Sequence, residues 1–418
     1  MDDSPSPVGE HVESDPGLLS PLEGIRVLDV SRFLAGPYAA WVLAELGADV
    51  IKVEDPDRPD EARSVGPFFV GEQSLYFAAL NGGKRSLAVR MREPQGRAVL
   101  LELVRGVDVV LDNHKPGVME KLGLGPDDLA RENPALVTCS LSGFGATGAF
   151  RERAGYDYTI QALSGVMSMT GEPGSPPGKA GISYVDHSGG LAAALAVCAA
   201  LVGRSRTGKG RHVDLALFDV QVSMLSYLAA WQLNAGFTGG RTPSASHPSL
   251  VPAQNFATSD GYISIFVGND AMWARLAGAL QDPYLLQRKF AMSSGRQESR
   301  QTLTEHLQRL IGTASSKHWV DLLERHQIPC APVNDLETAL KEPQVNDRGL
   351  IATAEHPSYG EYQYVRGPLA QLGHGETAAA PLLGEHTMSI LKEAGVAESR
   401  LRDLIENDII MSSGDEAR

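Results

Sequence analysis

Residues 25–54, IRVLDVSRFLAGPYAAWVLAELGADVIKVE, decide the fold of this chain. The run IRVLDVS (25–31) is typical of a buried strand. Gly36 and Pro37 then open YAAWVLAELGA, an apolar-periodic helix that ends near Gly47, and DVIKVE (49–54) has the pattern of a second short strand. This order predicts a βαβ unit, in which a right-handed crossover joins two parallel strands.

Two further cycles of strand and helix follow. SLAV (86–89) precedes a helix over 94–105 and the strand VDVVL (107–111), and a helix over 126–132 precedes the strand LVTCSL (136–141). This alternation predicts an α/β protein with a Rossmann-like, doubly wound parallel sheet. The ligand of such a sheet is expected at the carboxyl ends of the strands, beside helix N-termini.

The pattern changes near residue 220. A loop-rich stretch over 237–252 leads to the alternating strand GYISIFV (261–267) and then to helices, which predicts a smaller mixed α/β domain. We predict a disordered N-terminal arm (1–18), a large Rossmann-like domain (19–226), a small domain (227–350), and a linker with a C-terminal segment that returns to the large domain (351–418).

The composition limits the class of protein. Of the 418 residues, 43% are hydrophobic and 21% are charged, which excludes a wholly disordered chain, a coiled coil and a collagen-like fibre. The net charge of −14 disfavours nucleic acid and anionic membranes as partners. It does not exclude one anionic ligand in a local basic pocket.

The termini and the cysteines indicate the compartment. The opening MDDSPSPVGEHVESDPG is acidic and has no apolar core, so we expect neither a signal peptide nor a mitochondrial transit peptide. The longest apolar run, 191–202, is shorter than the ~20 residues of a membrane span, and we predict a buried core helix there. The three cysteines are odd in number and far apart, which argues against a disulfide framework or a zinc site. We therefore expect a cytoplasmic protein without a bound metal.

Two glycine motifs match nucleotide-binding loops in the wrong context. GFGATG (143–148) follows a strand, but no amphipathic helix comes after it, so it does not support an NAD-dependent oxidoreductase. GRSRTGK (203–209) is followed by Gly210 where a P-loop has Ser or Thr. We predict an ordinary turn at both positions.

The segment GISYVDHSGG (181–190) is the strongest candidate for chemistry. It places Asp186 just before the first turn of an apolar helix, either as an N-cap or as a carboxylate held ionised by the helix dipole. Gly189 and Gly190 would let a ligand approach the backbone. The polar segments RAGYDYTIQ (153–161), NGGKRS (81–86) and DNHKPG (112–117) are further candidates, each with an ordinary turn as the alternative.

Together these segments resemble the class III coenzyme A transferases, the family of formyl-CoA transferase, carnitine CoA-transferase and α-methylacyl-CoA racemase. The matching segments run in the family's order from about residue 21 to residue 386, and their sequences most resemble those of the succinyl-CoA–glutarate CoA-transferase branch. They are PLEGIRVLDVSRFLAGPYAAWVLAELGADVIKVEDP, NGGKRS, VLDNHKPGVMEKLG, SLSGFGATG, AGYD, GISYVDHSGG, RTGKGRHVDLALFD, SDGYISIFVGND, IPCAPVND and PLLGEHT.

The resemblance implies a covalent transferase with Asp186 as the nucleophile, acyl-CoA and a carboxylic acid as substrates, and no permanently bound cofactor. It also implies an interlocked homodimer, for which residues 202–226 and 349–381 are long enough to serve as linkers. By motif position, CoA would be contacted by Arg32, Phe33, Ala35, Lys84, Arg85, Asn113, His114, Lys121 and Leu122.

The sequence departs from formyl-CoA transferase at two positions. Asp55 stands where that enzyme has an arginine, which puts one phosphate contact in doubt. Leu34 stands where it has a glutamine, which weakens an oxalate assignment. We expect a dicarboxylate acceptor, whose second carboxylate Arg153 or His247 would hold, with Tyr156 also at the substrate.

Two alternatives stay open. An α-methylacyl-CoA racemase on the same fold needs two acid/base groups, and Tyr156 occupies the position where that branch has a histidine. The ordinary pKa of tyrosine, ~10, is poorly matched to proton abstraction at neutral pH. Asp157 could still serve as that group. The second alternative is a catalytically silent acyl-CoA-binding protein, against which the retained Asp186 argues.

Overall fold

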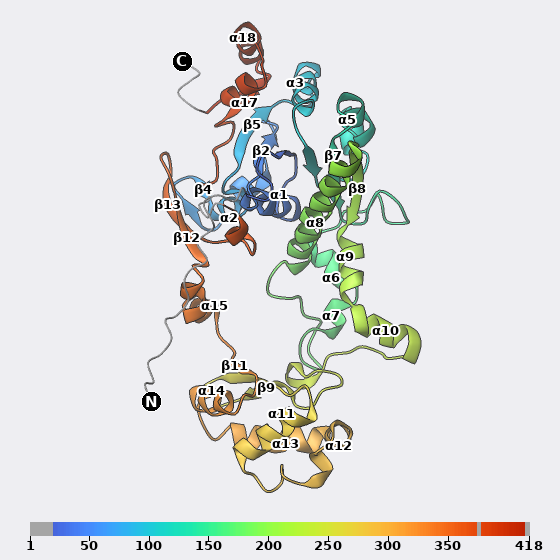
Figure 1. Cartoon of the computed structure of the whole chain (residues 1–418), viewed down its shortest axis with the longest axis vertical. Coiled ribbons are helices and arrows are strands. Elements are labelled where there is room, and N and C mark those ends of the chain that lie inside the picture. Colours follow the sequence, from blue (N-terminus) through green and yellow to red (C-terminus); the bar gives the residue numbers. More distant parts are fainter. Residues whose placement is uncertain (1–19, 374–377, 414–418) are drawn as a thin grey trace. The chain divides into compact units, whose positions relative to one another are not determined.

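The computed structural model describes residues 20–373 and 378–413. They form two compact units, the first from residues 20–164, 181–226 and 347–413 and the second from 165–180 and 227–346 (Figure 1). The predicted N-terminal arm (1–18) lies outside the described residues. The segment 165–180, which we predicted in the large domain, belongs to the second unit, and residues 347–350, which we predicted in the small domain, belong to the first.

A seven-stranded sheet forms the centre of the first unit. Its order is β14-β5-β2-β1-β6-β7-β8, and every pairing is parallel except that of β14 with β5. The predicted parallel α/β sheet is therefore confirmed. The strands are β1 Arg26–Asp29, β2 Asp49–Glu54, β5 Arg85–Val89, β6 Val109–Asp112, β7 Val137–Ser142, β8 Arg211–Ala216 and β14 Ile410–Met411.

Helices cover both faces of this sheet because alternate strand residues point to opposite sides. Val27 and Val137 belong to the core under α1 and α8, whereas Leu28 and Val110 belong to the core under α3, α5, α17 and α18. The covering helices are α1 Ala35–Glu45, α8 Tyr184–Thr207, α3 Pro94–Val104, α5 Pro126–Glu132, α17 Thr387–Glu393 and α18 Glu398–Glu406.

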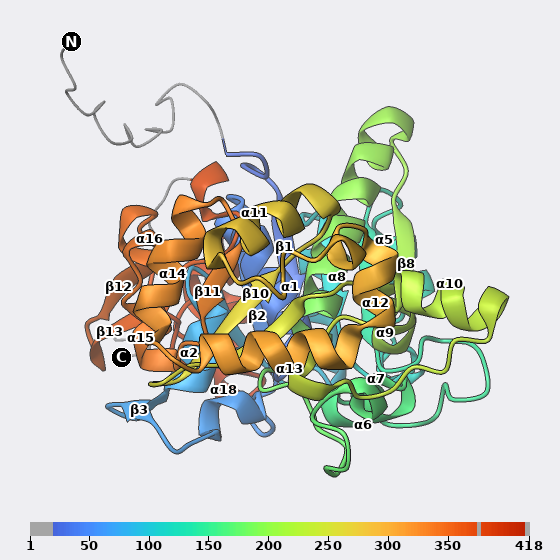
Figure 2. The same cartoon turned by 90° about the horizontal axis from the view of Figure 1, so that it is seen from below.

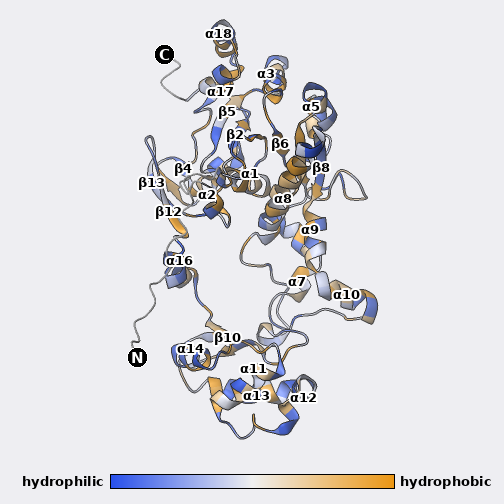
Figure 3. Cartoon of the chain, viewed as in Figure 1, coloured by the Kyte–Doolittle hydropathy of each residue, from blue (hydrophilic) through white to orange (hydrophobic). Residues whose placement is uncertain are grey.

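Helix α8 contains the predicted core run and lies against α1 (Figure 1). By length and composition alone it is the one helix among the described residues that could cross a membrane. Its buried side carries small residues, including Gly190, Ala193 and Ala194, which allow α1 to approach closely. Figure 3 shows the hydrophobic residues that run along it. This packing is that of a helix in a sheet core.

The C-terminal segment completes the first unit. His386 Nδ1 accepts the Ser86 N–H (3.2 Å), and the Gly384 N–H donates to Ser86 Oγ (3.0 Å), so the PLLGEHT motif is bound to β5. The smaller elements of this unit are η1 Glu61–Ser64, β3 Phe69–Val70, β4 Gln73–Ser74, α2 Leu75–Asn81, α4 Val118–Lys121, α6 Asp157–Leu163, α9 Leu217–Met224, β12 Ile351–His356, β13 Gly360–Val365 and η4 Ala370–Leu372.

The second unit has a three-stranded antiparallel sheet in the order β11-β10-β9. Helices α11, α13 and α14 lie around it and share one apolar core with it (Figure 2). Its main elements are β9 Ala253–Ala257, β10 Tyr262–Phe266, β11 Cys330–Pro332, α11 Asp270–Leu280, α12 Ser293–Glu298, α13 Arg300–Ile311 and α14 Ser316–Arg325. The shorter ones are α7 Val166–Met169, α10 Ser226–Ala235, η2 Pro243–Ala245, η3 Arg288–Phe290, α15 Leu336–Leu340 and α16 Pro343–Asp347.

Candidate active site

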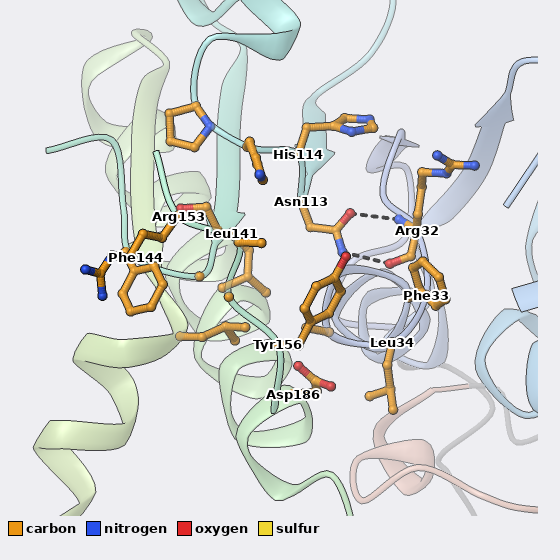
Figure 4. A pocket seen from close by; sticks show the side chains of 18 of the residues that line it. Arg32, Phe33, Leu34, Asn113, His114, Leu141, Phe144, Arg153, Tyr156 and Asp186 are labelled. Carbon is orange, nitrogen blue, oxygen red and sulfur yellow. Dashed lines mark hydrogen bonds between the residues drawn. The ribbon is translucent and has the colours of Figure 1, made fainter. Parts of the chain in front are cut away.

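A pocket of about 260 Å³ lies at the carboxyl ends of β1, β6 and β7 (Figure 4). From β1 the chain builds the sheet outward first through β2 and β5 and then, on the other side, through β6, β7 and β8. The carboxyl ends of β1 and β6 are therefore the topological switch point, where open α/β sheets bind ligands. The pocket is lined by residues from the loops after these strands, from segment 151–156, and from the first turn of α8. They include Arg32, Phe33, Leu34, Ala35, Asn113, His114, Ser142, Phe144, Arg153, Tyr156 and Asp186.

Asp186 lies within the first turn of α8, and Ser183 occupies the N-cap position. Asp186 is therefore not the N-cap that the sequence offered as its alternative role. In Figure 4 its carboxylate points into the pocket beside Tyr156 and Leu34. The positive end of the α8 dipole favours a negative charge there. Burial, and then the charges of Asp186 and Asp60, raise the pKa of Tyr76 to about 12.

The loop after β1 faces Asp186 across the pocket. Asn113 holds this loop with two hydrogen bonds: the Arg32 N–H donates to Asn113 Oδ1 (2.8 Å), and Asn113 Nδ2 donates to the Arg32 carbonyl oxygen (2.7 Å; Figure 4). Burial, and then the charge of Arg32, lowers the pKa of His114. The predicted residues Arg32, Phe33, Ala35, Asn113 and His114 are thus together at the pocket.

A second, smaller hollow of about 100 Å³ adjoins the pocket, and Arg32 and His114 line both. Leu122, predicted as a CoA contact, lines this hollow, whereas Lys121 lines neither cavity. Two further cations line it, Arg58 and Arg92, which the sequence analysis missed. Arg92 follows β5 at the carboxyl edge of the sheet, and this position in the sequence could have identified it as a candidate for ligand binding.

Lys84 and Arg85 are placed away from both cavities. The Lys84 side chain is fully buried, and its ammonium group donates to Asp29 Oδ2 (2.8 Å), Asn81 Oδ1 (2.9 Å) and the Pro37 carbonyl oxygen (2.9 Å). Arg85 pairs with Asp49 and Glu393. Because neither cation lines the pocket or the hollow, this geometry does not support their predicted contacts with CoA phosphates.

Gly189 and Gly190 face protein atoms, and neither lines the pocket. A Cβ on Gly190 would lie 2.7 Å from the Ala35 carbonyl oxygen, and one on Gly189 would lie 2.2 Å from Leu217 Cδ2. These glycines thus accommodate α1 and Leu217, and this geometry does not support the predicted contact with a ligand.

The remaining predicted residues differ in placement. Arg153 and Tyr156 line the pocket, and the Arg153 guanidinium lies 4.0 Å from the centre of the Phe150 ring. His247 belongs to the second unit, where its Nδ1 accepts the N–H groups of Ser249 (3.1 Å) and Leu250 (3.2 Å).

Asp157 is buried, and its carboxylate accepts hydrogen bonds from the Val185 N–H (3.1 Å) and from Gln161 Nε2 (2.8 Å). It therefore supports the start of α8 and does not line the pocket. No group of three or more His, Cys, Asp or Glu side chains that could hold a metal ion occurs between residues 20 and 373 or between 378 and 413.

Comparison with known proteins decides the family. The model of CoA-transferase family III matches residues 22–387. The chain belongs to this family. It is therefore a CoA-transferase that uses CoA thioesters, and the resemblance read from its motifs is confirmed.

Several relatives span most of the chain. Succinyl-CoA:glutarate CoA-transferase of Homo sapiens is 37% identical over 91% of this chain and 87% of its own length. Succinate–glutarate CoA-transferase of Agrobacterium fabrum is 38% identical over 92% and 98%, respectively. The crystal structure of a CAIB/BAIF family protein from Brucella suis covers 90% of this chain and 100% of its own, with a TM-score of 0.79 and 36% identity.

Proposed function

We propose that this enzyme moves CoA from succinyl-CoA, or a similar acyl-CoA, to a free dicarboxylic acid, with Asp186 as the covalent nucleophile. The observation that carries the proposal is the Asp186 carboxylate in the first turn of α8, directed into a pocket at the switch point of the sheet. Relatives named for succinyl-CoA, glutarate and mesaconate support the dicarboxylate class.

The reaction proceeds by exchange of acyl bonds at Asp186. A carboxylate oxygen of Asp186 attacks the thioester carbon of the donor. The C–S bond breaks, which releases CoA as a thiolate and leaves the donor acyl group on Asp186 as a mixed anhydride. The thiolate then attacks the Asp186 carbonyl carbon, which releases the donor acid and leaves CoA as a thioester on Asp186. The acceptor carboxylate repeats these two steps in reverse order, which forms the new acyl-CoA and restores Asp186.

The pocket supplies donors for the oxyanions formed in these steps. Helix α1 begins at Ala35, and its first helical hydrogen bond runs from the Tyr38 N–H to the Leu34 carbonyl oxygen (2.7 Å). The amides of Ala35 and Gly36 precede that bond, so the hydrogen bonds within α1 do not use them, and Ala35 lines the pocket. Amides placed at developing negative charge lower the barrier of acyl transfer.

The CoA moiety is assigned to the adjoining hollow. Arg32, Arg58 and Arg92 line it and provide cations for the CoA phosphates. They form a local basic site on a chain whose net charge is −14. Phe33, Ala35, Asn113, His114 and Leu122 complete the proposed contacts.

The acceptor's second carboxylate is assigned to Arg153, which lines the pocket together with Tyr156 and Asp186. A planar guanidinium binds a carboxylate through two parallel hydrogen bonds. His247, the other residue that the sequence suggested for this role, belongs to the second unit, so the assignment is made to Arg153 alone. The proposal makes the Arg153 contact specific to dicarboxylates, so that a monocarboxylate acceptor would not use it.

We further propose an interlocked homodimer as the working assembly. Large apolar side chains are exposed on α8 and α10, among them Leu195 and Leu233, whose exposed fractions are 72% and 82%. Burial of such residues by a second copy is favourable. Light scattering coupled to size exclusion tests this: twice the mass of 44.6 kDa is expected, and a monomer that transfers CoA would refute it.

The test of function is a mass-spectrometric assay in D₂O with succinyl-CoA, a 2-methylacyl-CoA and a set of carboxylic acids. We expect new dicarboxylyl-CoA thioesters with the wild type and none with Asp186→Ala. Asp219→Asn is the matched control, because Asp219 is also an acid in the first turn of a helix but is exposed and lies outside the pocket.

The other outcomes have defined meanings. Deuterium at the α-carbon without a new thioester would establish a racemase and refute the proposal. Tight binding of succinyl-CoA without either product would indicate a silent acyl-CoA-binding protein. Transfer that persists in Asp186→Ala would refute the assignment of the nucleophile alone.

A further inference from the structure

Phe33 has a backbone conformation that a residue with a side chain rarely adopts. Its φ angle is +63°, in the left-handed region. The Cβ atom makes this region unfavourable for residues other than glycine, so the surrounding structure has to enforce it. Phe33 lies between Arg32 and Leu34 in the loop that faces Asp186 (Figure 4). Contacts with the rest of the first unit therefore have to hold Phe33 in this conformation.

Asp60 makes the contact that holds Phe33 from behind the pocket. The Phe33 N–H donates to Asp60 Oδ1 (3.0 Å), and the same oxygen accepts the Ala62 N–H (3.0 Å). The other oxygen, Oδ2, lies 2.9 Å from Lys52 Nζ, and both side chains are fully buried. Both carboxylate oxygens of Asp60 are therefore bound by protein groups, and its side chain is fully buried although Asp60 is one of the residues around the adjoining hollow.

Lys52 connects Asp60 to the start of the loop. Its ammonium group also donates to the Ser31 carbonyl oxygen (2.8 Å). Burial works to raise the pKa of Asp60, but the Lys52 charge and the two N–H groups outweigh it and hold that pKa below its usual value. Asp60 and Lys52 are thus both charged, and charge-assisted hydrogen bonds of this kind are the stronger ones.

The held loop sets where α1 begins. Ser31 is bound by Lys52, Arg32 by Asn113 and Phe33 by Asp60, and the helix starts two residues after Phe33 at Ala35. A negative φ at Phe33 would redirect the chain at Leu34 and move the first amides of α1. Those amides are the groups that the proposed function places at the reacting carbonyl.

We propose that Asp60, together with its buried partner Lys52, is a positioning residue for CoA transfer, which holds Phe33 in the left-handed conformation and thereby sets the first amides of α1 opposite Asp186. This inference rests on the proposed function. It assigns a role in the reaction to an ion pair whose two side chains are fully buried.

The test compares Asp60→Asn with Asp108→Asn. Asp108 also forms an ion pair, in its case with Arg204 at 2.8 Å, but it precedes β6 at the opposite edge of the sheet. We expect Asp60→Asn to lower kcat by roughly 10- to 100-fold, since small misplacements at a reacting centre have effects of this size. The KM for acyl-CoA should change far less, because the Asp60 side chain is fully buried and the proposed phosphate contacts in the adjoining hollow come from Arg32, Arg58 and Arg92. Asp108→Asn should affect stability only.

A second substitution separates positioning from folding. Glycine adopts a positive φ without the Cβ penalty, so Phe33→Gly should restore part of the kcat lost in Asp60→Asn. A purely structural role of Asp60 predicts no such rescue. An unchanged kcat in folded Asp60→Asn, or a double variant no faster than Asp60→Asn, would overturn the proposal.

A crystal structure of Asp60→Asn provides a readout independent of activity. A negative φ at Phe33 is expected, and a φ that stays near the wild-type angle would overturn the proposal. If the wild type transferred no CoA to any acid, the proposed function would fail, and this structure would still decide whether Asp60 holds Phe33.

Discussion

The two adjacent glycines of α8 should respond very differently to the same substitution. A Cβ on Gly190 would lie 2.7 Å from the Ala35 carbonyl oxygen, 2.9 Å from Tyr38 Cδ1 and 3.3 Å from the Ala39 nitrogen. Two of these three atoms belong to the α1 backbone, which cannot rotate away. Gly190→Ala therefore has to push α1 off α8.

At Gly189 the only close neighbour is the end of a flexible side chain. The new Cβ would lie 2.2 Å from Leu217 Cδ2, and the next atom is 3.7 Å away. A change of the Leu217 rotamer removes the clash at a cost of about 0.5–1.5 kcal/mol. Replacement of glycine by alanine inside a helix stabilises the folded state by about 0.5–1 kcal/mol, so the gain and the rotamer cost nearly cancel for Gly189→Ala.

The same gain does not offset the clash at Gly190. Overpacking of a close-packed core costs about 1–3 kcal/mol, and backbone contacts place this site at the upper end of that range. We therefore expect Gly190→Ala to lower the local free energy of unfolding by about 2 kcal/mol. Gly203, where a Cβ would meet nothing within 4 Å, is the control: Gly203→Ala should stabilise α8.

Hydrogen exchange followed by mass spectrometry reports this local stability for peptides of α1 and α8. A loss of about 2 kcal/mol accelerates exchange through local opening by about 30-fold. Gly189→Ala should exchange at nearly the wild-type rate. Equal rates in the two alanine variants, or wild-type exchange in Gly190→Ala, would refute the argument that α1 rather than a ligand occupies the space beside Gly190.

Three further predictions concern charge. Burial raises the pKa of Asp112 to about 6 from the usual 3.8, so between these pH values the folded protein holds a proton that the unfolded chain has lost. The free energy of unfolding should therefore fall as pH rises from about 4 to about 6, by at most about 3 kcal/mol. Urea titrations should show this decline in the wild type relative to Asp112→Asn. Parallel curves for the two proteins would contradict it. Arg58→Ala and Arg92→Ala should raise the KM for succinyl-CoA at least about tenfold with little change in kcat; an unchanged KM would remove these arginines from the CoA site. Arg153→Ala should raise the KM for a dicarboxylate acceptor but not for a monocarboxylate, and equal KM values for the wild type and the variant would exclude Arg153 from acceptor binding.

The sequence predicted strands β1, β2, β5, β6 and β7 because each carries its own signal, whereas the two-residue strand β14 was not predicted. Strands covered on both faces are largely apolar, as VDVVL and LVTCSL are, and such runs are visible without knowledge of their partners. The loops that follow β1 and β6 could be assigned to the ligand edge for the same reason. Asp186, Asn113 and Tyr156 all line the resulting pocket.

Roles that depend on distant partners could not be derived in this way. A lysine beside two glycines has the same local sequence whether it binds a phosphate or a buried carboxylate, and Asp29 lies 55 residues before Lys84. Gly190 is likewise compatible with a ligand or with a helix, and α1 occupies the space. The segment 165–180 is rich in glycine and proline, and only its tertiary contacts assign it to the second unit.

One geometric rule, applied strictly, would have improved the assignment of the CoA site. In a parallel sheet, residues that precede a strand lie at its amino edge and residues that follow it lie at the carboxyl edge, where ligands bind. Lys84 and Arg85 stand at the start of β5, and Arg85 reaches Asp49 at the amino edge. Arg92 stands just after the same strand and lines the hollow beside the pocket. In this chain the order of residue and strand therefore predicts which cation lines the hollow better than the presence of neighbouring glycines does.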